Sequence, residues 1–95
     1  MALLEKAAGQ GHAYAMDALG CVYGVRQEHE RAVEWYTKGA VAGLPKAKFN
    51  LGCCLEEAEG VAAPDYPAAA GWYRHGLADI ALLVVQRMLH PGILN

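Results

Sequence analysis

Serine is absent from this sequence, and Thr37 is its only threonine. A serine nucleophile is therefore excluded, and with it the serine hydrolases. β-Branched residues are also scarce while alanine is abundant, a composition that favours helix over strand. Apolar residues make up 55% of the 95 residues and charged residues 19%, which is the composition of a folded protein. These scarcities together predict an all-α fold.

The chain also lacks an excess of either charge and any long hydrophobic run. The formal net charge is −2, and the eight Lys and Arg residues are scattered, so no basic surface for nucleic acid is expected. The longest apolar stretch, 78–85, is interrupted by Asp79 and is far shorter than the roughly 18 residues of a membrane-spanning helix. The opening residues 1–6 turn charged at Glu5 and do not resemble a secretory signal. We therefore expect a cytoplasmic protein with no membrane partner.

No metal-binding or catalytic pattern is apparent among the cysteines and histidines. Cys21, Cys53 and Cys54 form no C-x-x-C pair, and the four histidines are dispersed. An odd number of cysteines without framework spacing favours free thiols in a reducing compartment. Adjacent Cys53 and Cys54 point about 100° apart on a helix, so they are poorly placed to share a metal ion. We predict no catalytic residue, no cofactor and no metal site, and expect that the chain is not an enzyme.

An internal repeat organises most of the chain. When the sequence is aligned with itself at an offset of 32 residues, residues 6–21 match residues 38–53 at seven of sixteen positions. The identical residues are Lys6, Ala8, Gly11, Ala15, Leu19, Gly20 and Cys21 in the first copy and Lys38, Ala40, Gly43, Ala47, Leu51, Gly52 and Cys53 in the second. Further along, Trp35-Tyr36 reappears as Trp72-Tyr73. The second copy is longer by residues 56–59 and by one residue near Pro64, and insertions of this kind belong in loops.

Apolar residues recur with helical spacing inside each copy, which predicts two helices per repeat. Ala15, Leu19 and Tyr23 follow one another every four residues, and Trp35-Tyr36 belongs to an i, i+3, i+4 pattern. Because large aromatics at such spacing are mostly buried, we expect the Trp-Tyr pairs in the core and not in a ligand site. Asp65 is suited to cap the fifth helix. The predicted helices span residues 2–9, 12–23, 28–42, 45–58, 66–77 and 79–90.

Glycine and proline mark the ends and the contacts of these helices. Gly11 and Gly43 stand where a left-handed residue ends a helix, and Pro45 suits the first turn of the next one. Gly20 and Gly52 fall in the middle of predicted helices, where glycine costs about 1 kcal/mol relative to alanine. Their recurrence at one position of both copies predicts a close approach between helices.

These residues together resemble the Sel-one-like repeat, a branch of the tetratricopeptide superfamily. The pattern in the first copy is Ala15, Leu19-Gly20, Tyr23, Gly24-Val25, Glu28, Ala32 and Trp35-Tyr36-Thr37-Lys38, and in the second Ala47, Leu51-Gly52, Leu55, Gly60-Val61, Asp65, Ala69 and Trp72-Tyr73-Arg74. The resemblance covers residues 3–76 and implies helix-turn-helix repeats stacked as a right-handed α-solenoid. The first copy lacks the usual loop between Tyr23 and Gly24, so a tight turn is expected there, and Leu55 replaces a tyrosine.

The resemblance divides the chain into four parts. Residues 1–11 correspond to the end of a preceding repeat, 12–43 and 44–77 to two repeats, and 78–95 to a degenerate last repeat, a cap or damaged sequence. Apolar residues cover nearly all sides of the helix predicted at 79–90, which suggests burial against another surface and makes self-association through this C-terminal helix one option. A stack of this length leaves apolar faces bare at its ends, so a fragment of a longer array is also expected.

The resemblance places the functional surface on the concave side, lined by the first helix of each repeat. The candidate partner-binding residues are Tyr14, Asp17, Cys21, Lys46, Phe49, Cys53 and Glu56, with Gly24 at the tight turn. Phe49 is the strongest candidate because an exposed aromatic is a frequent anchor, although packing against a neighbouring side chain is an equally good interpretation. Glu56, Glu57 and Glu59 are expected to form a solvated acidic loop.

The family therefore implies a scaffold or adaptor that binds a partner peptide or helix. The alternative is a docking or spacer segment of a larger multidomain regulatory protein. The sequence of the full reading frame would separate the two.

Overall fold

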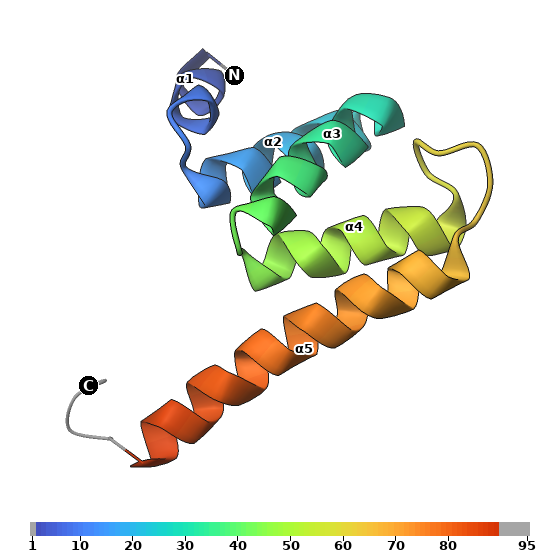
Figure 1. Ribbon diagram of the computed structural model, residues 1–95. Coiled ribbons are helices and arrows are strands. Elements are labelled where there is room, and N and C mark those ends of the chain that lie inside the picture. Colours follow the sequence, from blue (N-terminus) through green and yellow to red (C-terminus); the bar gives the residue numbers. More distant parts are fainter. Residues whose placement is uncertain (1, 90–95) are drawn as a thin grey trace.

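The computed structural model describes residues 2–89, and this part of the chain forms five α-helices (Figure 1). They are α1 (Ala2–Gly9), α2 (Ala13–Val25), α3 (His29–Val41), α4 (Pro45–Glu57) and α5 (Tyr66–Leu89). No strand occurs among residues 2–89, so the all-α prediction is confirmed. We also find no helix within the described residues that is long and apolar enough to cross a membrane.

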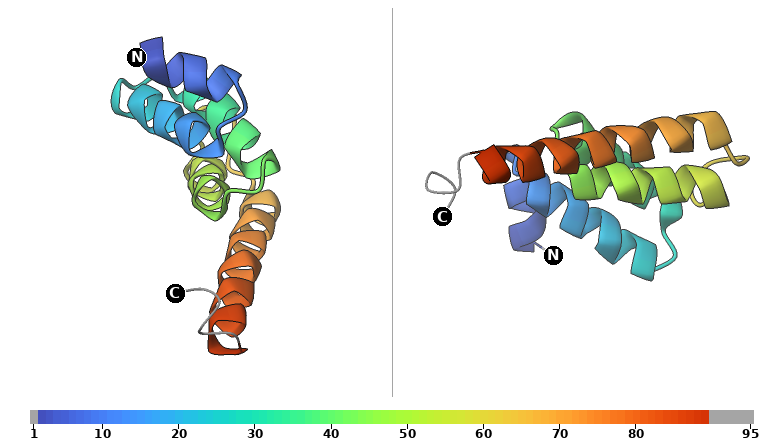
Figure 2. Two further views of the ribbon diagram at one scale, coloured as in Figure 1. Left: turned by 90° about the vertical axis from the view of Figure 1, so that its left-hand side faces the viewer. Right: turned by 90° about the horizontal axis from the view of Figure 1, so that it is seen from below.

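Each helix packs mainly against the helices next to it in sequence. Figure 1 shows α2 and α3 as an antiparallel pair, α4 below α3, and the long α5 running back alongside α4. The view from below in Figure 2 shows the same α4–α5 pair side by side. The C-terminal part of α5 extends past the N-terminal end of α4. The elements therefore follow one another in space in the order in which they follow one another in the chain.

Each of the first four helices ends at a residue with left-handed backbone. Gly11 (φ 91°) and Gly43 (φ 99°) follow α1 and α3, as predicted. Gln27 (φ 65°) does the same after α2, and the Glu28 amide donates to the Tyr23 carbonyl over 2.8 Å. This bond and its counterparts at the glycines satisfy carbonyls that the helix leaves open. Because α2 closes only at Gln27, it runs two residues beyond its predicted end, and only residues 26–28 separate it from α3.

The ends of α4 and α5 largely agree with the sequence. Pro45 is in the first turn of α4, and the Asp65 side chain accepts a hydrogen bond from the Ala68 amide at 3.1 Å, as expected for an N-cap. The predicted acidic loop of Glu56, Glu57 and Glu59 is wrong in part. Glu56 and Glu57 belong to the last turn of α4, and only Glu59 lies in the loop. That helix ends at Ala58, a non-glycine residue with left-handed backbone (φ 56°), and the connection to α5 follows it.

The two mid-helix glycines create equivalent contacts in the two helix pairs. A Cβ atom on Gly20 would lie 2.5 Å from two ring carbons of Tyr36, and one on Gly52 would lie 2.7 Å from the ring of Tyr73. Carbon atoms normally approach to about 3.5–4.0 Å, so only glycine leaves room for these rings. The predicted close approach is therefore present in both copies, between the first and second helix of each pair.

The predicted core stripe is buried in the first copy except for Trp35, which is half-buried, and it is less complete in the second, where Trp72 and Tyr73 are both half-buried. Leu19 is fully buried, and Ala32 and Ala40 are covered on α3. The residue of α5 that corresponds to Ala40 is Leu77, which is 59% exposed. The difference arises because α3 packs against two helices, α2 and α4. Among residues 2–89, α5 packs mainly against one helix, α4.

The break predicted between helices at 66–77 and 79–90 is wrong, because α5 is continuous from Tyr66 to Leu89. Earlier helices end at a left-handed residue, but nothing of that kind occurs between Leu77 and Leu89. Gly76 lies within the continuous helix, and the ring of Phe49 packs against it, 3.0 Å from where a Cβ would lie. Residues 77–79 are ordinary helix formers and simply continue the helix. Residue 90, the predicted end, lies outside the described residues.

Candidate functional site

The first helices of the two copies, α2 and α4, are joined by polar side chains. The Asn50 side-chain amide donates to one Asp17 carboxylate oxygen at 2.8 Å, and Lys46 Nζ lies 3.8 Å from the other oxygen. Asp17 is buried, at 3% exposure, although it carries a carboxylate. A carboxylate removed from water needs hydrogen bonds or an opposite charge, and Asn50 and Lys46 supply one each. Asp17 therefore links α4 directly to α2.

Beyond this contact, a hollow of about 360 Å³ opens between the C-terminal halves of the two helices. Its lining consists of Cys21, Gly24 and Val25 from α2, His29, Ala32 and Tyr36 from α3, Asn50, Cys53 and Cys54 from α4, and Glu59 from the following loop. Small side chains and thiols make up most of these walls. We name the surface formed by α2, α4 and this hollow the inter-repeat groove.

Two tyrosines donate hydrogen bonds to equivalent thiols along the groove. The Tyr36 hydroxyl is 3.3 Å from Cys21 Sγ, and the Tyr73 hydroxyl is 3.4 Å from Cys53 Sγ. Burial, followed by the bond to Cys21, raises the pKa of Tyr36 above its ordinary value. The bond to Cys53 has the largest part in raising the pKa of Tyr73, which also donates to Glu56 at 3.0 Å. Both hydroxyls are therefore protonated donors at neutral pH.

The third thiol of the hollow is poorly reactive. Burial is the main cause that raises the pKa of Cys54 to about 11, with a further contribution from nearby Glu59. Because the thiolate is the nucleophile and the metal ligand, a thiol with this pKa is inert at neutral pH. All three cysteines are free thiols, and residues 2–89 hold no cluster of three or more His, Cys, Asp or Glu side chains arranged for a metal ion.

The predicted partner-binding residues differ in how accessible they are. Tyr14 is 78% exposed, and Lys46, Cys53 and Glu56 are also on the surface. Cys21 is half-buried under the Tyr36 hydroxyl. The structure brings Asp17 next to Lys46 and places Cys21 and Cys53 in one hollow, whereas Tyr14 stands apart at the start of α2.

Phe49 packs towards α5. Its side chain is half-buried, the ring lies against Gly76, and its centroid is 6.1 Å from that of Tyr73. Of the two interpretations offered by the sequence, packing against a neighbour describes this geometry. Phe49 thus belongs to the contact between α4 and α5, and the accessible aromatic on α2 is Tyr14.

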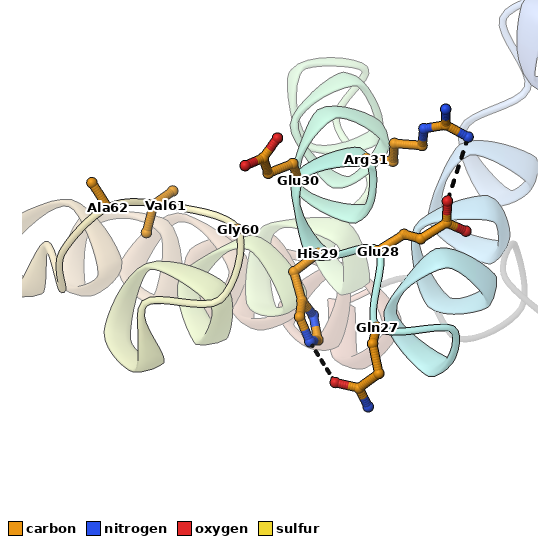
Figure 3. A pocket seen from close by; sticks show the side chains of 8 residues that line it. All are labelled: Gln27, Glu28, His29, Glu30, Arg31, Gly60, Val61 and Ala62. Carbon is orange, nitrogen blue, oxygen red and sulfur yellow. Dashed lines mark hydrogen bonds and ion pairs between the residues drawn. The ribbon is translucent and has the colours of Figure 1, made fainter.

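A second hollow, of about 590 Å³, lies between the start of α3 and the loop after α4 (Figure 3). His29 is central to it: Nε2 lies 3.0 Å from Gln27 Oε1, and Nδ1 lies 3.3 Å from Glu59 Oε2. The loop approaches so closely that a Cβ on Gly60 would lie 2.3 Å from the His29 carbonyl oxygen. These contacts connect the first helix pair to the loop of the second and close one end of the groove.

Sequence reasoning did not single out Asn50 or His29, which shape the groove, and it placed Glu59 in a solvated acidic loop and not at this contact. One available signal was the difference between repeats, since Asn50 of the second copy corresponds to Ala18 of the first. A polar residue that replaces an alanine at one repeat position indicates a contact specific to that repeat. His29 and Glu59 meet only through the fold, because they belong to different repeats. No protein-family model, curated protein or solved structure matches this chain.

Proposed function

We propose that this chain is a protein-interaction scaffold of Sel-one-like repeats, stacked as a right-handed α-solenoid, which binds a partner peptide or helix in the inter-repeat groove. The observation that carries the proposal is the groove itself: two helices at equivalent repeat positions, held together by Asp17, with a hollow of about 360 Å³ between them. A concave surface lined by the first helix of each repeat is how stacked helical repeats present a binding site.

Recurring contacts support the repeat interpretation. The tyrosine ring over glycine and the tyrosine hydroxyl on cysteine occur once in α2–α3 and once in α4–α5. Each contact joins residues 15 to 21 positions apart, at corresponding places in the two copies. Chance similarity of sequence would not be expected to reproduce both a packing contact and a hydrogen bond.

The groove suits binding because its walls are already fixed. The Asn50–Asp17 hydrogen bond spans the two helices, and the contact of His29 with Glu59 joins the loop to the start of α3. Binding of a partner would therefore not cost the conformational entropy of ordering the site. Lys46 and Glu56 offer opposite charges at the two ends of α4, which gives an elongated partner a preferred direction.

Site-specific photo-crosslinking in the cell of origin tests this function. A photoreactive amino acid replaces Tyr14 or Cys53, both exposed on the proposed binding face. Glu34 is the matched control, because it is exposed on the side of α3 opposite its buried residues. We expect covalent adducts of the same partner at Tyr14 and Cys53 and few at Glu34. Equal adducts at all three positions, or adducts at Glu34 alone, would show that the groove is not the binding surface.

A further inference from the structure

The C-terminal half of α5 is an apolar surface that the rest of the described chain does not cover. Figures 1 and 2 show this half extending past the end of α4. Eight large apolar side chains between Leu77 and Leu89 have exposed fractions of 42% to 75%. Isolated exposed apolar residues are normal on a soluble protein, but a contiguous group of this size marks an interaction surface.

Charge is almost absent from this half of the helix. Asp79 and Arg87 are its only charged residues, and Asp79 is held by an ion pair with Lys48 of α4. A helix that faces water over most of its circumference normally carries a broad polar face. Here a single charge, Arg87, remains free of an ion pair to α4 among residues 77–89, so the surface suits an apolar partner and not a charged one.

The exposed residues include a stripe with the spacing of a helix–helix seam. Leu77, Ala81, Val84 and Met88 are separated by four, three and four positions, the alternation that keeps apolar residues on one side of a helix. At 100° per residue this stripe is centred about 110° around the helix from Gly76, which faces α4. Ile80 and Val85 flank it. The stripe thus forms one continuous seam on the side that α4 leaves open; its residues other than the small Ala81 are about half exposed or more.

We propose that a second copy of this chain covers this seam, with the two α5 helices antiparallel about a twofold axis. The four–three–four spacing reads the same in both directions, so in an antiparallel pair Leu77 meets Met88 of the other copy and Ala81 meets Val84. Large side chains then face each other at the ends, and a small one faces a β-branched one in the middle, which allows close packing. Antiparallel helices also align their dipoles favourably. The two repeat bodies lie at opposite ends of the shared helix pair.

The available area reaches the lower limit for such a dimer. Burying a fully exposed large aliphatic side chain releases a free energy that is proportional to the apolar area removed from water. At the usual free energy per unit of area, this release corresponds to on the order of 100 Å² of apolar surface. The stripe and its flanks are partly exposed already in the single chain, so they contribute at most about 500 Å² per chain, and a pair of chains buries up to about 1,000 Å². This is the size at which a specific interface becomes distinguishable from a chance contact. The dimer surface is on α5 and leaves the inter-repeat groove of each copy free.

Sedimentation equilibrium of the purified chain, from about 1 to 200 μM, tests the proposal. We expect a concentration-dependent mass that reaches twice the chain mass. Val84→Glu places a carboxylate in the seam of each copy and raises the dimer dissociation constant by about 100-fold or more, because a buried unpaired charge is costly. Leu83→Glu is the matched control, since Leu83 is similarly exposed but lies about 100° away around the helix. It leaves the dissociation constant within about threefold of the unsubstituted chain.

Two results would overturn the proposal: a monomer at every concentration, or a dimer that Val84→Glu and Leu83→Glu weaken equally. Far-UV circular dichroism of both variants checks that α5 stays helical, which is expected because neither position is buried. Orientation is tested by oxidising a mixture of Leu77→Cys and Met88→Cys chains and identifying the linked peptides by mass spectrometry. An antiparallel pair gives 77–88 links. Predominant 77–77 and 88–88 links would contradict the antiparallel arrangement.

Discussion

Replacing Gly20 by alanine is expected to destabilise the protein, although the same change in an open part of a helix stabilises it. In an unobstructed helix interior, glycine to alanine gains about 1 kcal/mol. At Gly20 the new Cβ would lie 2.5 Å from the Tyr36 ring, so the ring must withdraw by about 1 Å to reach normal contact distance. Tyr36 is buried and its hydroxyl is bonded to Cys21, which leaves the ring little freedom to move.

The magnitude follows from these opposing effects. Overpacking a core by one methyl group costs about 1–3 kcal/mol, and the rigid ring places Gly20→Ala towards the upper end. After the helix gain, the free energy of unfolding should fall by about 1–2 kcal/mol, or a melting temperature lower by roughly 5–10 °C for a domain of this size. Gly71→Ala is the control, because it is within α5 and no atom lies within 4 Å of its Cβ position. It should stabilise by up to about 1 kcal/mol.

Urea unfolding followed by circular dichroism at 222 nm measures both variants. A double-mutant cycle at the equivalent site identifies the cause: Gly52→Ala should destabilise the protein, but it should become stabilising once Tyr73→Ala has removed the ring. If Gly20→Ala raised stability as much as Gly71→Ala, or if the cycle showed no coupling, the close packing of rings on glycines would be refuted.

Three further predictions use other parts of the structure. Ala58→Gly should raise the free energy of unfolding by about 0.5–1 kcal/mol in the same urea assay, because Ala58 has φ 56° and only glycine adopts that conformation without strain; a loss of stability would contradict it. Iodoacetamide at pH 8, followed by mass spectrometry, should modify exposed Cys53 first and Cys54 last. A pKa of about 11 lowers the thiolate fraction of Cys54 about 100-fold relative to a pKa of 9.0. Equal modification rates would refute the burial of Cys54. Asp17→Ala should lower the free energy of unfolding by about 1–3 kcal/mol, because it leaves Asn50 without its partner, and an unchanged urea midpoint would show that the contact contributes nothing.

The sequence predicted local features well. The helix ends at Gly11 and Gly43, the N-cap at Asp65 and the close approach at Gly20 are each encoded by one or two neighbouring residues and the backbone conformation that they permit. The continuous α5 was missed because repeat logic places a turn there, whereas the residues after Leu77 contain nothing that stops a helix. In that place the physical chemistry of the individual residues outweighed the periodicity.

The candidate site was predicted less completely, because its contacts join residues far apart in the chain. Asp17 was predicted as an accessible partner-binding residue, but it is buried, and its burial depends on Asn50, 33 positions later. Phe49 could be placed on α4 from its spacing, yet whether it faced solvent depended on how α5 packs against α4. Helical periodicity gives the direction of a side chain around its own axis and says nothing of which neighbour it meets.

Because every helix packs chiefly on those adjacent in sequence, the chain can acquire its structure step by step. Each new contact closes only a short loop, so little entropy is lost before packing compensates for it. Proteins dominated by such short-range contacts fold within microseconds to milliseconds. During synthesis, α2 and α3 can already form a pair while α5 is still inside the ribosome. The apolar half of α5 emerges after α1 to α4, when these earlier helices can already have buried their own apolar faces.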